Sequence, residues 1–240
     1  MPATLTDLTR TLNLTFGPFN LEPRWPTKSS VRRLPRAIVM SDNKRMPDPA
    51  AVLDELPRGV AMVFRHYGDP NRAILAQKVV DQAHRLGIKV LVAGDAQLAR
   101  RVGADGVHLP GRLLHRRVLF RIAAMRPSWL ITAAVHDRHE LTRATSAGVD
   151  AVMVSPVFPT TTHVQRQALG VIGLTRMATA ARMPVFALGG INTKVLPRLK
   201  PCGVIGFAGI GQFTRCRWHN ALPHACELGE SVESDIVHED

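Results

Sequence analysis

Residues 148–163 read GVDAVMVSPVFPTTTH, and this stretch joins a short apolar run to a polar loop. Residues 152–154 are apolar without alternation, which is typical of a strand in a parallel sheet whose two faces are both covered. The run then breaks at Pro156 and leads into three threonines and His163. Hydroxyl groups gathered after a buried strand form either a plain solvated loop or a set of hydrogen-bond donors for an anionic ligand.

The same unit, an apolar run followed by a helical pattern, recurs along the chain from residue 36 to residue 212. The clearest helical pattern covers residues 70–87, where apolar residues recur near the helical period and Gly87 ends the pattern. A shorter helix is expected over residues 195–200, and Asp137 and Glu140 have the spacing of a capping box at the start of another helix. Strands that alternate with helices pair in parallel through right-handed crossovers. About eight such units are present, the number that closes a barrel, so the sequence predicts an α/β fold of the (β/α)8 TIM-barrel type. An open doubly wound sheet is the alternative, and the polar residues after nearly every apolar run favour the barrel.

The two ends of the chain do not follow this alternation of strand-like and helical runs. We expect a single barrel domain over residues 36–212, an N-terminal extension over residues 1–35 and a C-terminal tail over residues 213–240. The tail contains CRWHNALPHAC, which brings together four residues of zinc-binding type but matches no standard finger spacing. These residues are Cys216, His219, His224 and Cys226.

Composition limits the class of protein. The 240 residues include only three cysteines, which are too few and too late in the chain for a disulfide framework. No apolar stretch is long enough to span a bilayer and the N-terminus lacks the order of a secretory signal, so we expect a soluble, cytoplasmic protein. The net charge of +12 suits anionic ligands, but no nucleic-acid-binding motif accompanies it. We therefore expect no specific nucleic acid and no membrane as partner, and the sequence leaves homo-oligomer formation open.

In a barrel of this kind, ligand-binding residues come from the C-terminal ends of the strands. Arg65 could grip a phosphate bidentately or form an ordinary salt bridge at the rim. Asp95 could hold a magnesium ion or cap the helix that follows it. The glycine-rich turns after the last two strands expose backbone N–H groups that can cradle a phosphate. The candidates in these turns are Gly189, Gly190, Ala208 and Gly209.

Five segments together resemble the thiamine phosphate synthase/TenI family. They are GADGVHLPG (103–111), AAVHD (133–137), GVDAVMVSPVFPTTTH (148–163), PVFALGGI (184–191) and GVIGFAGI (203–210), and the resemblance runs over roughly residues 36–212. It implies a barrel that binds phosphorylated thiazole and pyrimidine precursors of thiamine. The synthase joins a hydroxymethylpyrimidine pyrophosphate to a thiazole phosphate and releases pyrophosphate, whereas TenI-type members aromatise a thiazole precursor by proton transfer.

Transfer of the family's residues onto this chain is incomplete. The motif after the second strand, Gln-x-Arg-x-Lys in the synthases, keeps Arg65 but carries Tyr67 in place of lysine. The resemblance implies Mg²⁺ as cofactor with Asp95 as the surviving ligand, while the second carboxylate is missing near Arg112. The threonine loop keeps Thr160 and Thr162, which would donate hydrogen bonds to a phosphorylated ligand. Its lysine has become His163, which would act as a cation or as an acid or base.

Three functions follow from the resemblance. The first is a divergent thiamine phosphate synthase-like transferase of thiamine biosynthesis. The second is a TenI-like tautomerase in which His108, His136 or His163 moves a proton; the presence of Ser155-Pro156, where that family has a histidine, counts against it. The third is a non-catalytic thiazole-phosphate-binding protein, which the missing carboxylate favours.

Overall fold

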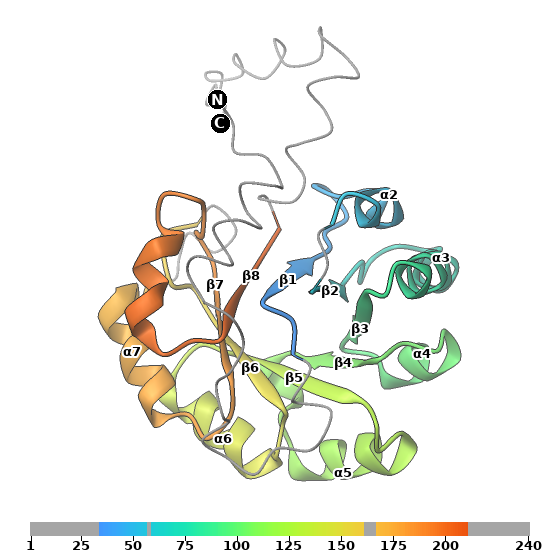
Figure 1. The fold of residues 1–240 in the computed structure, drawn as a ribbon. Coiled ribbons are helices and arrows are strands. Elements are labelled where there is room, and N and C mark those ends of the chain that lie inside the picture. The colour runs from blue at the N-terminus through green and yellow to red at the C-terminus, as the bar shows by residue number, and fades with distance from the viewer. Residues whose placement is uncertain (1–33, 57–58, 161–166, 211–240) are drawn as a thin grey trace, which may run out of the picture.

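Eight parallel strands close into a barrel in the order β1 to β8, with β8 paired to β1 (Figure 1). The computed structural model describes residues 34–56, 59–160 and 167–210. The predicted (β/α)8 barrel is confirmed. The strands are β1 (Ala37–Met40), β2 (Val60–Phe64), β3 (Lys89–Ala93), β4 (Gly106–Leu109), β5 (Leu130–Val135), β6 (Ala151–Val154), β7 (Val185–Leu188) and β8 (Gly206–Gly209).

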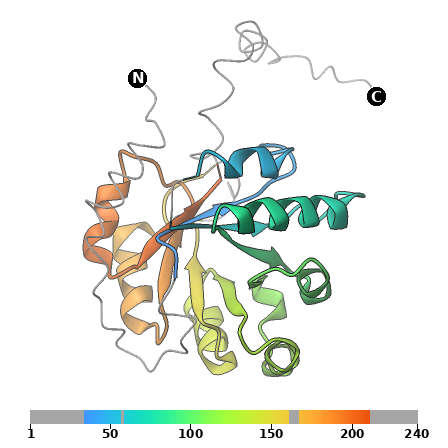
Figure 2. The ribbon, with the colours of Figure 1, turned by 45° about the vertical axis from the view of Figure 1, so that its right-hand side comes forward.

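Helices follow one another around the outside of the strands, as Figures 1 and 2 show. The α-helices are α2 (Pro49–Leu53), α3 (Arg72–Arg85), α4 (Ala96–Arg101), α5 (Arg116–Met125), α6 (Arg138–Ala147) and α7 (Gly170–Ala180), joined by the 3₁₀ helices η2 (Gly111–Leu113) and η3 (Leu196–Cys202). In the part of the chain that the structure describes, none of these helices is long and apolar enough to cross a membrane.

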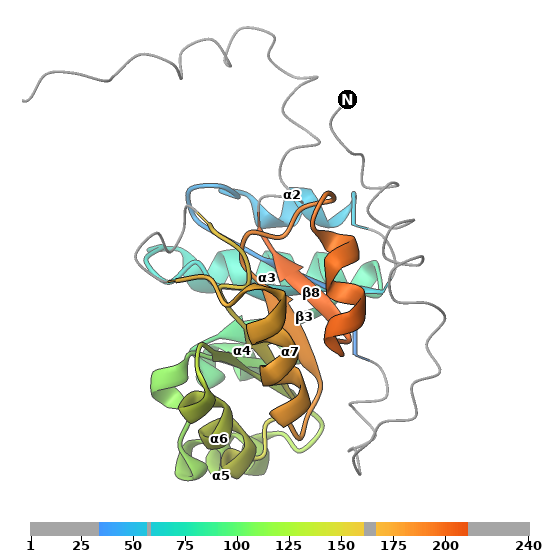
Figure 3. The same cartoon turned by 90° about the vertical axis from the view of Figure 1, so that its left-hand side faces the viewer.

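The helix expected around residues 195–200 is a 3₁₀ helix, η3, which packs beside α7 (Figure 3). Pro197 lies in its first turn and Pro201 lies inside it. Proline has no backbone N–H and its ring clashes with the preceding turn, so a regular α-helical hydrogen-bond pattern cannot run through this segment.

Several helix starts are fixed by aspartates at the ends of strands or loops. Asp48 accepts hydrogen bonds from the backbone of Ala50 and Ala51 at the start of α2, and Asp95 caps α4. Asp137 caps α6 by accepting from the backbone N–H of Glu140. Each cap holds the loop before it in place.

Side-chain alternation divides the strands other than β4 between two apolar clusters. One cluster fills the barrel interior and includes Val63 and Ala93, while the other faces the helices. Residues two positions further along a strand point to the same side. Arg65 follows Val63 and Asp95 follows Ala93 by two residues, so the barrel interior continues directly into the charged mouth at the C-terminal ends of the strands.

A candidate active site at the C-terminal mouth of the barrel

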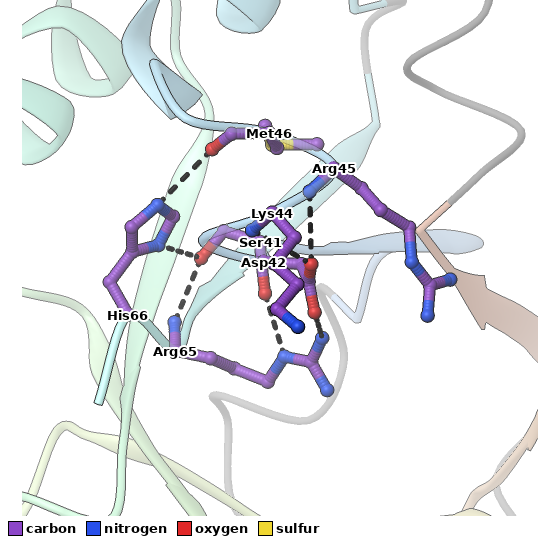
Figure 4. A network of polar contacts seen from close by, with 7 residues as sticks. All are labelled: Ser41, Asp42, Lys44, Arg45, Met46, Arg65 and His66. Carbon is purple, nitrogen blue, oxygen red and sulfur yellow. Dashed lines mark hydrogen bonds and ion pairs between the residues drawn. The ribbon is translucent and has the colours of Figure 1, made fainter. Parts of the chain in front are cut away.

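The loops after β1 and β2 are joined by a buried hydrogen-bond network (Figure 4). The hydroxyl of Ser41 accepts a hydrogen bond from the backbone N–H of Arg65 at 2.8 Å and lies 2.9 Å from Nδ1 of His66. Nε2 of His66 lies 3.1 Å from the carbonyl oxygen of Met46, which can only accept, so Nε2 carries the proton and Nδ1 accepts from Ser41.

This serine and histidine are structural. Ser41 is 0% and His66 1% exposed, so neither reaches a ligand. Burial lowers the pKa of His66, which keeps the ring neutral. The pair fixes the backbone of Arg65 at the barrel mouth.

Among the described residues, the Arg65 side chain is anchored at the mouth by Ser41 and Asp42. Its Nε donates to the carbonyl oxygen of Ser41 at 2.7 Å and one terminal nitrogen donates to Asp42 at 3.2 Å (Figure 4). Asp42 is itself held by the backbone N–H groups of Lys44 and Arg45. A guanidinium has five N–H donors, so Arg65 keeps donors for a ligand. Burial lowers the pKa of Arg65 and the charge of Asp42 opposes that shift.

Asp95 has both carboxylate oxygens engaged by protein. One accepts from the backbone N–H of Leu98 at 2.8 Å as the α4 cap, and the other lies 3.2 Å from a terminal nitrogen of Arg72. Arg72 also donates to the carbonyl oxygen of Ala93 at 2.8 Å, and its guanidinium carbon lies 5.4 Å from the centre of the Tyr67 ring.

These residues do not fit the magnesium site that the resemblance implies. Mg²⁺ prefers six oxygen ligands in near-ideal octahedral geometry. Over residues 34–56, 59–160 and 167–210, no group of three or more His, Cys, Asp or Glu side chains could hold a metal ion. Asp95 is bound to a guanidinium, and Arg112 begins the segment where the second carboxylate was expected.

Two histidines project toward the same mouth. Nδ1 of His136 donates to the carbonyl oxygen of Ser155 at 2.7 Å, and the backbone N–H of His136 donates to Glu140 at 2.8 Å. Within the described chain no residue binds Nε2 of His136, so this nitrogen can meet a ligand. His108 lies deeper and contacts Thr132 at 2.9 Å. Burial lowers the pKa of His108 to about 3, and the charges of Arg65 and His136 add to that shift.

The glycine turn after β7 packs directly on the loop after β6. The backbone N–H groups of Val157 and Phe158 donate to the carbonyl oxygens of Leu188 and Gly189 at 2.9 and 3.0 Å. Gly190 has φ +65°, and a Cβ there would collide with the carbonyl oxygen of Pro159. Only glycine fits this turn, which is partly exposed at the mouth.

The structure describes some of the predicted residues more fully than others. Ala208 is buried in the barrel interior and paired with Ile38, and Gly209 at the end of β8 is partly exposed. Thr160 is half-buried. Two predicted residues of the threonine loop, Thr162 and His163, lie outside the described residues. The four residues of zinc-binding type in the tail also lie outside them: Cys216, His219, His224 and Cys226.

Three residues of the hydrogen-bond networks at the mouth were not singled out from the sequence. Ser41 looked like the polar end of a strand, and Glu140 was expected only as part of a capping box. Arg72 was assigned to the start of a helix. It is the first residue of α3 and lies five residues after Tyr67.

Comparison with known proteins agrees with this geometry. A family model described as thiamine monophosphate synthase matches residues 37–213. The chain is 29% identical over 185 residues to a putative thiamine-phosphate synthase 2 of Aquifex aeolicus, covering 75% of this chain and 98% of that protein. It is 28% identical over 210 residues to a thiamine-phosphate synthase of Anoxybacillus flavithermus, covering 84% and 94%. The match to a Synechococcus thiamine-phosphate synthase, at 34% identity over 151 residues, covers 62% of this chain and 42% of that longer protein.

Among solved structures, a thiamine phosphate pyrophosphorylase from Pyrococcus furiosus superposes with a TM-score of 0.61 at 23% identity. The superposition covers 74% of this chain and 86% of that one. At this level of identity it supports the barrel fold.

Proposed function

The chain belongs to the thiamine monophosphate synthase family, and from this premise we propose that it is a divergent thiamine phosphate synthase-like transferase. The proposed reaction joins hydroxymethylpyrimidine pyrophosphate to thiazole phosphate. The bond between the pyrimidine methylene carbon and the pyrophosphate oxygen breaks, and that carbon bonds to the thiazole nitrogen. Pyrophosphate leaves with the electron pair of the broken bond.

The observation that carries the proposal is the fixed position of Arg65. Negative charge grows on the departing pyrophosphate, and preorganised positive groups that meet it in the transition state are usually the largest source of rate enhancement. Ser41 holds the Arg65 backbone and Asp42 holds its guanidinium, which leaves further donors pointing to the mouth. The same side chain therefore binds the leaving group without having to reorganise.

The other substrate would lie at the ends of β6, β7 and β8, on the side of the mouth that continues from β1. We assign the thiazole phosphate to the turn at Gly189 and Gly190 together with Gly209, where the absence of side chains lets phosphate oxygens approach the backbone. Thr160, at the end of the loop packed on this turn, would add its hydroxyl. Thr162 and His163 are proposed to complete the same loop.

A tautomerase is the second candidate, and the geometry of His136 favours it. Its ring is oriented by Ser155 through Nδ1, and Nε2 has no partner among the described residues. A histidine held in this way can take a proton from one ligand atom and return it to another. His108 suits that role poorly because burial keeps its imidazole neutral and weakly basic.

The test is turnover by the purified full chain with both substrates, followed as thiamine phosphate by chromatography, in buffers with Mg²⁺ and with EDTA. We expect product, and a loss of about 100-fold or more in kcat/KM for Arg65→Ala. Arg85→Ala, an exposed arginine on α3, is the matched control and should retain activity. Absence of product in both buffers would overturn the synthase, and saturable thiazole phosphate binding would then identify a binding protein.

A further inference from the structure

Arg72 occupies the place that a metal ion would need beside Asp95. Its guanidinium lies between the Asp95 carboxylate and the Tyr67 ring, with a third contact to the carbonyl oxygen of Ala93. Tyr67 in turn lies against Gly94: a Cβ at Gly94 would come within 3.3 Å of the tyrosine ring. The side chain is thus held from three directions, as a residue of a preformed site is.

Arg72 keeps binding capacity in spite of these contacts. The contacts with Asp95 and Ala93 engage its two terminal nitrogens, while Nε is buried and has no hydrogen-bond partner among the described residues. Each terminal nitrogen carries two N–H groups and uses one of them in these contacts, so two N–H donors remain for the oxygens of a ligand. The Arg72 side chain is 17% exposed, so it borders the mouth without being freely solvated.

The positive charges of three arginines act on Tyr67. Arg65, Arg72 and Arg112 all act to lower the pKa of Tyr67, although desolvation is larger and raises it. Against these three positive charges stand two carboxylates, Asp42 and Asp95, which leaves a net positive charge. Closely spaced guanidiniums match the oxygens of a phosphate or diphosphate group.

We infer that Arg72 supplies, beside Asp95, the positive charge that a metal ion would otherwise bring, and that the mouth binds a diphosphate group without Mg²⁺. Asp95 then acts as a positioning residue: it caps α4 and orients Arg72. Arg65 and Arg72 bind the diphosphate from two neighbouring loops, and Arg112 adds charge from the loop after β4. This inference rests on the proposed function, since it assigns the subsite for the leaving group of that reaction.

The first test is binding of inorganic pyrophosphate to the full chain by isothermal titration calorimetry. We expect saturable binding in EDTA that is at least as tight as binding in excess Mg²⁺. Arg72→Ala should weaken it by about tenfold or more, the effect of losing one charge-assisted contact. Arg85→Ala, on the same helix, should bind like the unaltered protein. Pyrophosphate binding that appears only with Mg²⁺ would overturn the inference.

Asp95→Asn separates the two roles of the carboxylate by whether its effect depends on Mg²⁺. Asparagine is as good an N-cap as aspartate, so α4 is retained, and a thermal unfolding curve would verify this. If Asp95 only positions Arg72, the change alters pyrophosphate affinity by the same factor in EDTA and in Mg²⁺. If Asp95 holds a metal ion, the change lowers the affinity in Mg²⁺ but not in EDTA and overturns the inference.

Failure of this inference can be told apart from failure of the proposed function. Formation of thiamine phosphate that requires Mg²⁺ and is lost in Asp95→Asn would retain the synthase and reject the role of Arg72. Pyrophosphate binding in EDTA that depends on Arg72, without any thiamine phosphate formed, would reject the synthase and retain the arginine site.

Discussion

His108 shows how one buried side chain can make the stability of the protein depend on pH. It lies 4% exposed in the barrel interior beside Thr132, where burial and the positive charges of Arg65 and His136 all disfavour the charged ring. Its pKa falls from an ordinary 6.5 to about 3 in the folded protein because burial penalises the imidazolium. Below pH 6.5 the unfolded chain therefore binds more protons at this residue than the folded chain does, and stability falls as the pH falls.

From this sign we predict that His108 destabilises the protein by about 2 kcal/mol at pH 5 relative to neutral pH. Urea unfolding at pH 7.5 and pH 5.0 would measure it. Between pH 7.5 and pH 5.0 the free energy of unfolding of the unaltered protein should fall by about 2 kcal/mol more than that of His108→Asn. This difference does not depend on the absolute stability of the variant. His139→Gln, an exposed histidine, is the control. Equal losses in His108→Asn and the unaltered protein would show that His108 takes no part.

The arginines show where prediction from single residues stops. Arg65 was recognised because it follows a predicted strand, where ligand-binding residues of a barrel lie, and because a guanidinium can bind a phosphate bidentately. Arg72 was missed because its role comes from partners on another element: Asp95 lies 23 positions further along the chain. The sequence pattern of one segment does not predict such a pairing, because the pairing forms only when the start of α3 meets the start of α4 at the barrel mouth.

At the scale of elements, the turn at Gly189 and Gly190 connects packing to ligand binding. Its backbone accepts hydrogen bonds from the loop after β6, and Gly190 touches that loop at Pro159. A side chain at Gly190 would push away the loop that carries Thr160. The turn and the threonine loop therefore form one unit.

We predict that Gly190→Ala weakens thiazole phosphate binding by about tenfold or more, because small displacements of a positioning loop are costly. Gly203→Ala is the matched control: Gly203 also has positive φ, +72°, but a Cβ there meets only the Cβ of Ala178 at 3.9 Å. Both variants should lose about 1–2 kcal/mol from the left-handed backbone, and only Gly190→Ala should lose more. Calorimetry and thermal unfolding would measure both effects. Unchanged affinity in Gly190→Ala would remove this turn from the binding site.

Element types followed from the sequence wherever periodicity and caps agree. The strands were read from apolar runs, and α4 and α6 begin at the aspartates expected to cap them. The segment before β8 was read as a helix, but two prolines make it a 3₁₀ helix. Closure of the sheet was inferred from the number of units and from the polar residues after nearly every apolar run, since no local pattern shows that β8 pairs with β1.

For the whole molecule, that closure depends on a glycine. The backbone N–H of Phe207 donates to the carbonyl oxygen of Arg36 at 3.0 Å, where the last strand meets the first. Gly206 lies against the same carbonyl oxygen, and a Cβ at Gly206 would collide with it. Gly106 has the same relation to the carbonyl oxygen of Leu130. Two strands of the barrel thus approach their neighbours more closely than a side chain allows.

We predict that Gly206→Ala lowers the free energy of unfolding by about 1–3 kcal/mol, the usual cost of forcing a methyl group into a packed interior. The collision is with backbone, which cannot rotate away, so β1 and β8 must separate and the hydrogen bond between Phe207 and Arg36 lengthens. Gly68→Ala is the control, because a Cβ at Gly68 meets nothing within 4 Å, and its stability should stay within about 0.5 kcal/mol. Urea unfolding would give both values, and faster hydrogen exchange at the amide of Phe207 in Gly206→Ala would locate the damage. Equal stability of the two variants would contradict the prediction, because it would mean that β1 and β8 can separate at Gly206 without loss of free energy of unfolding.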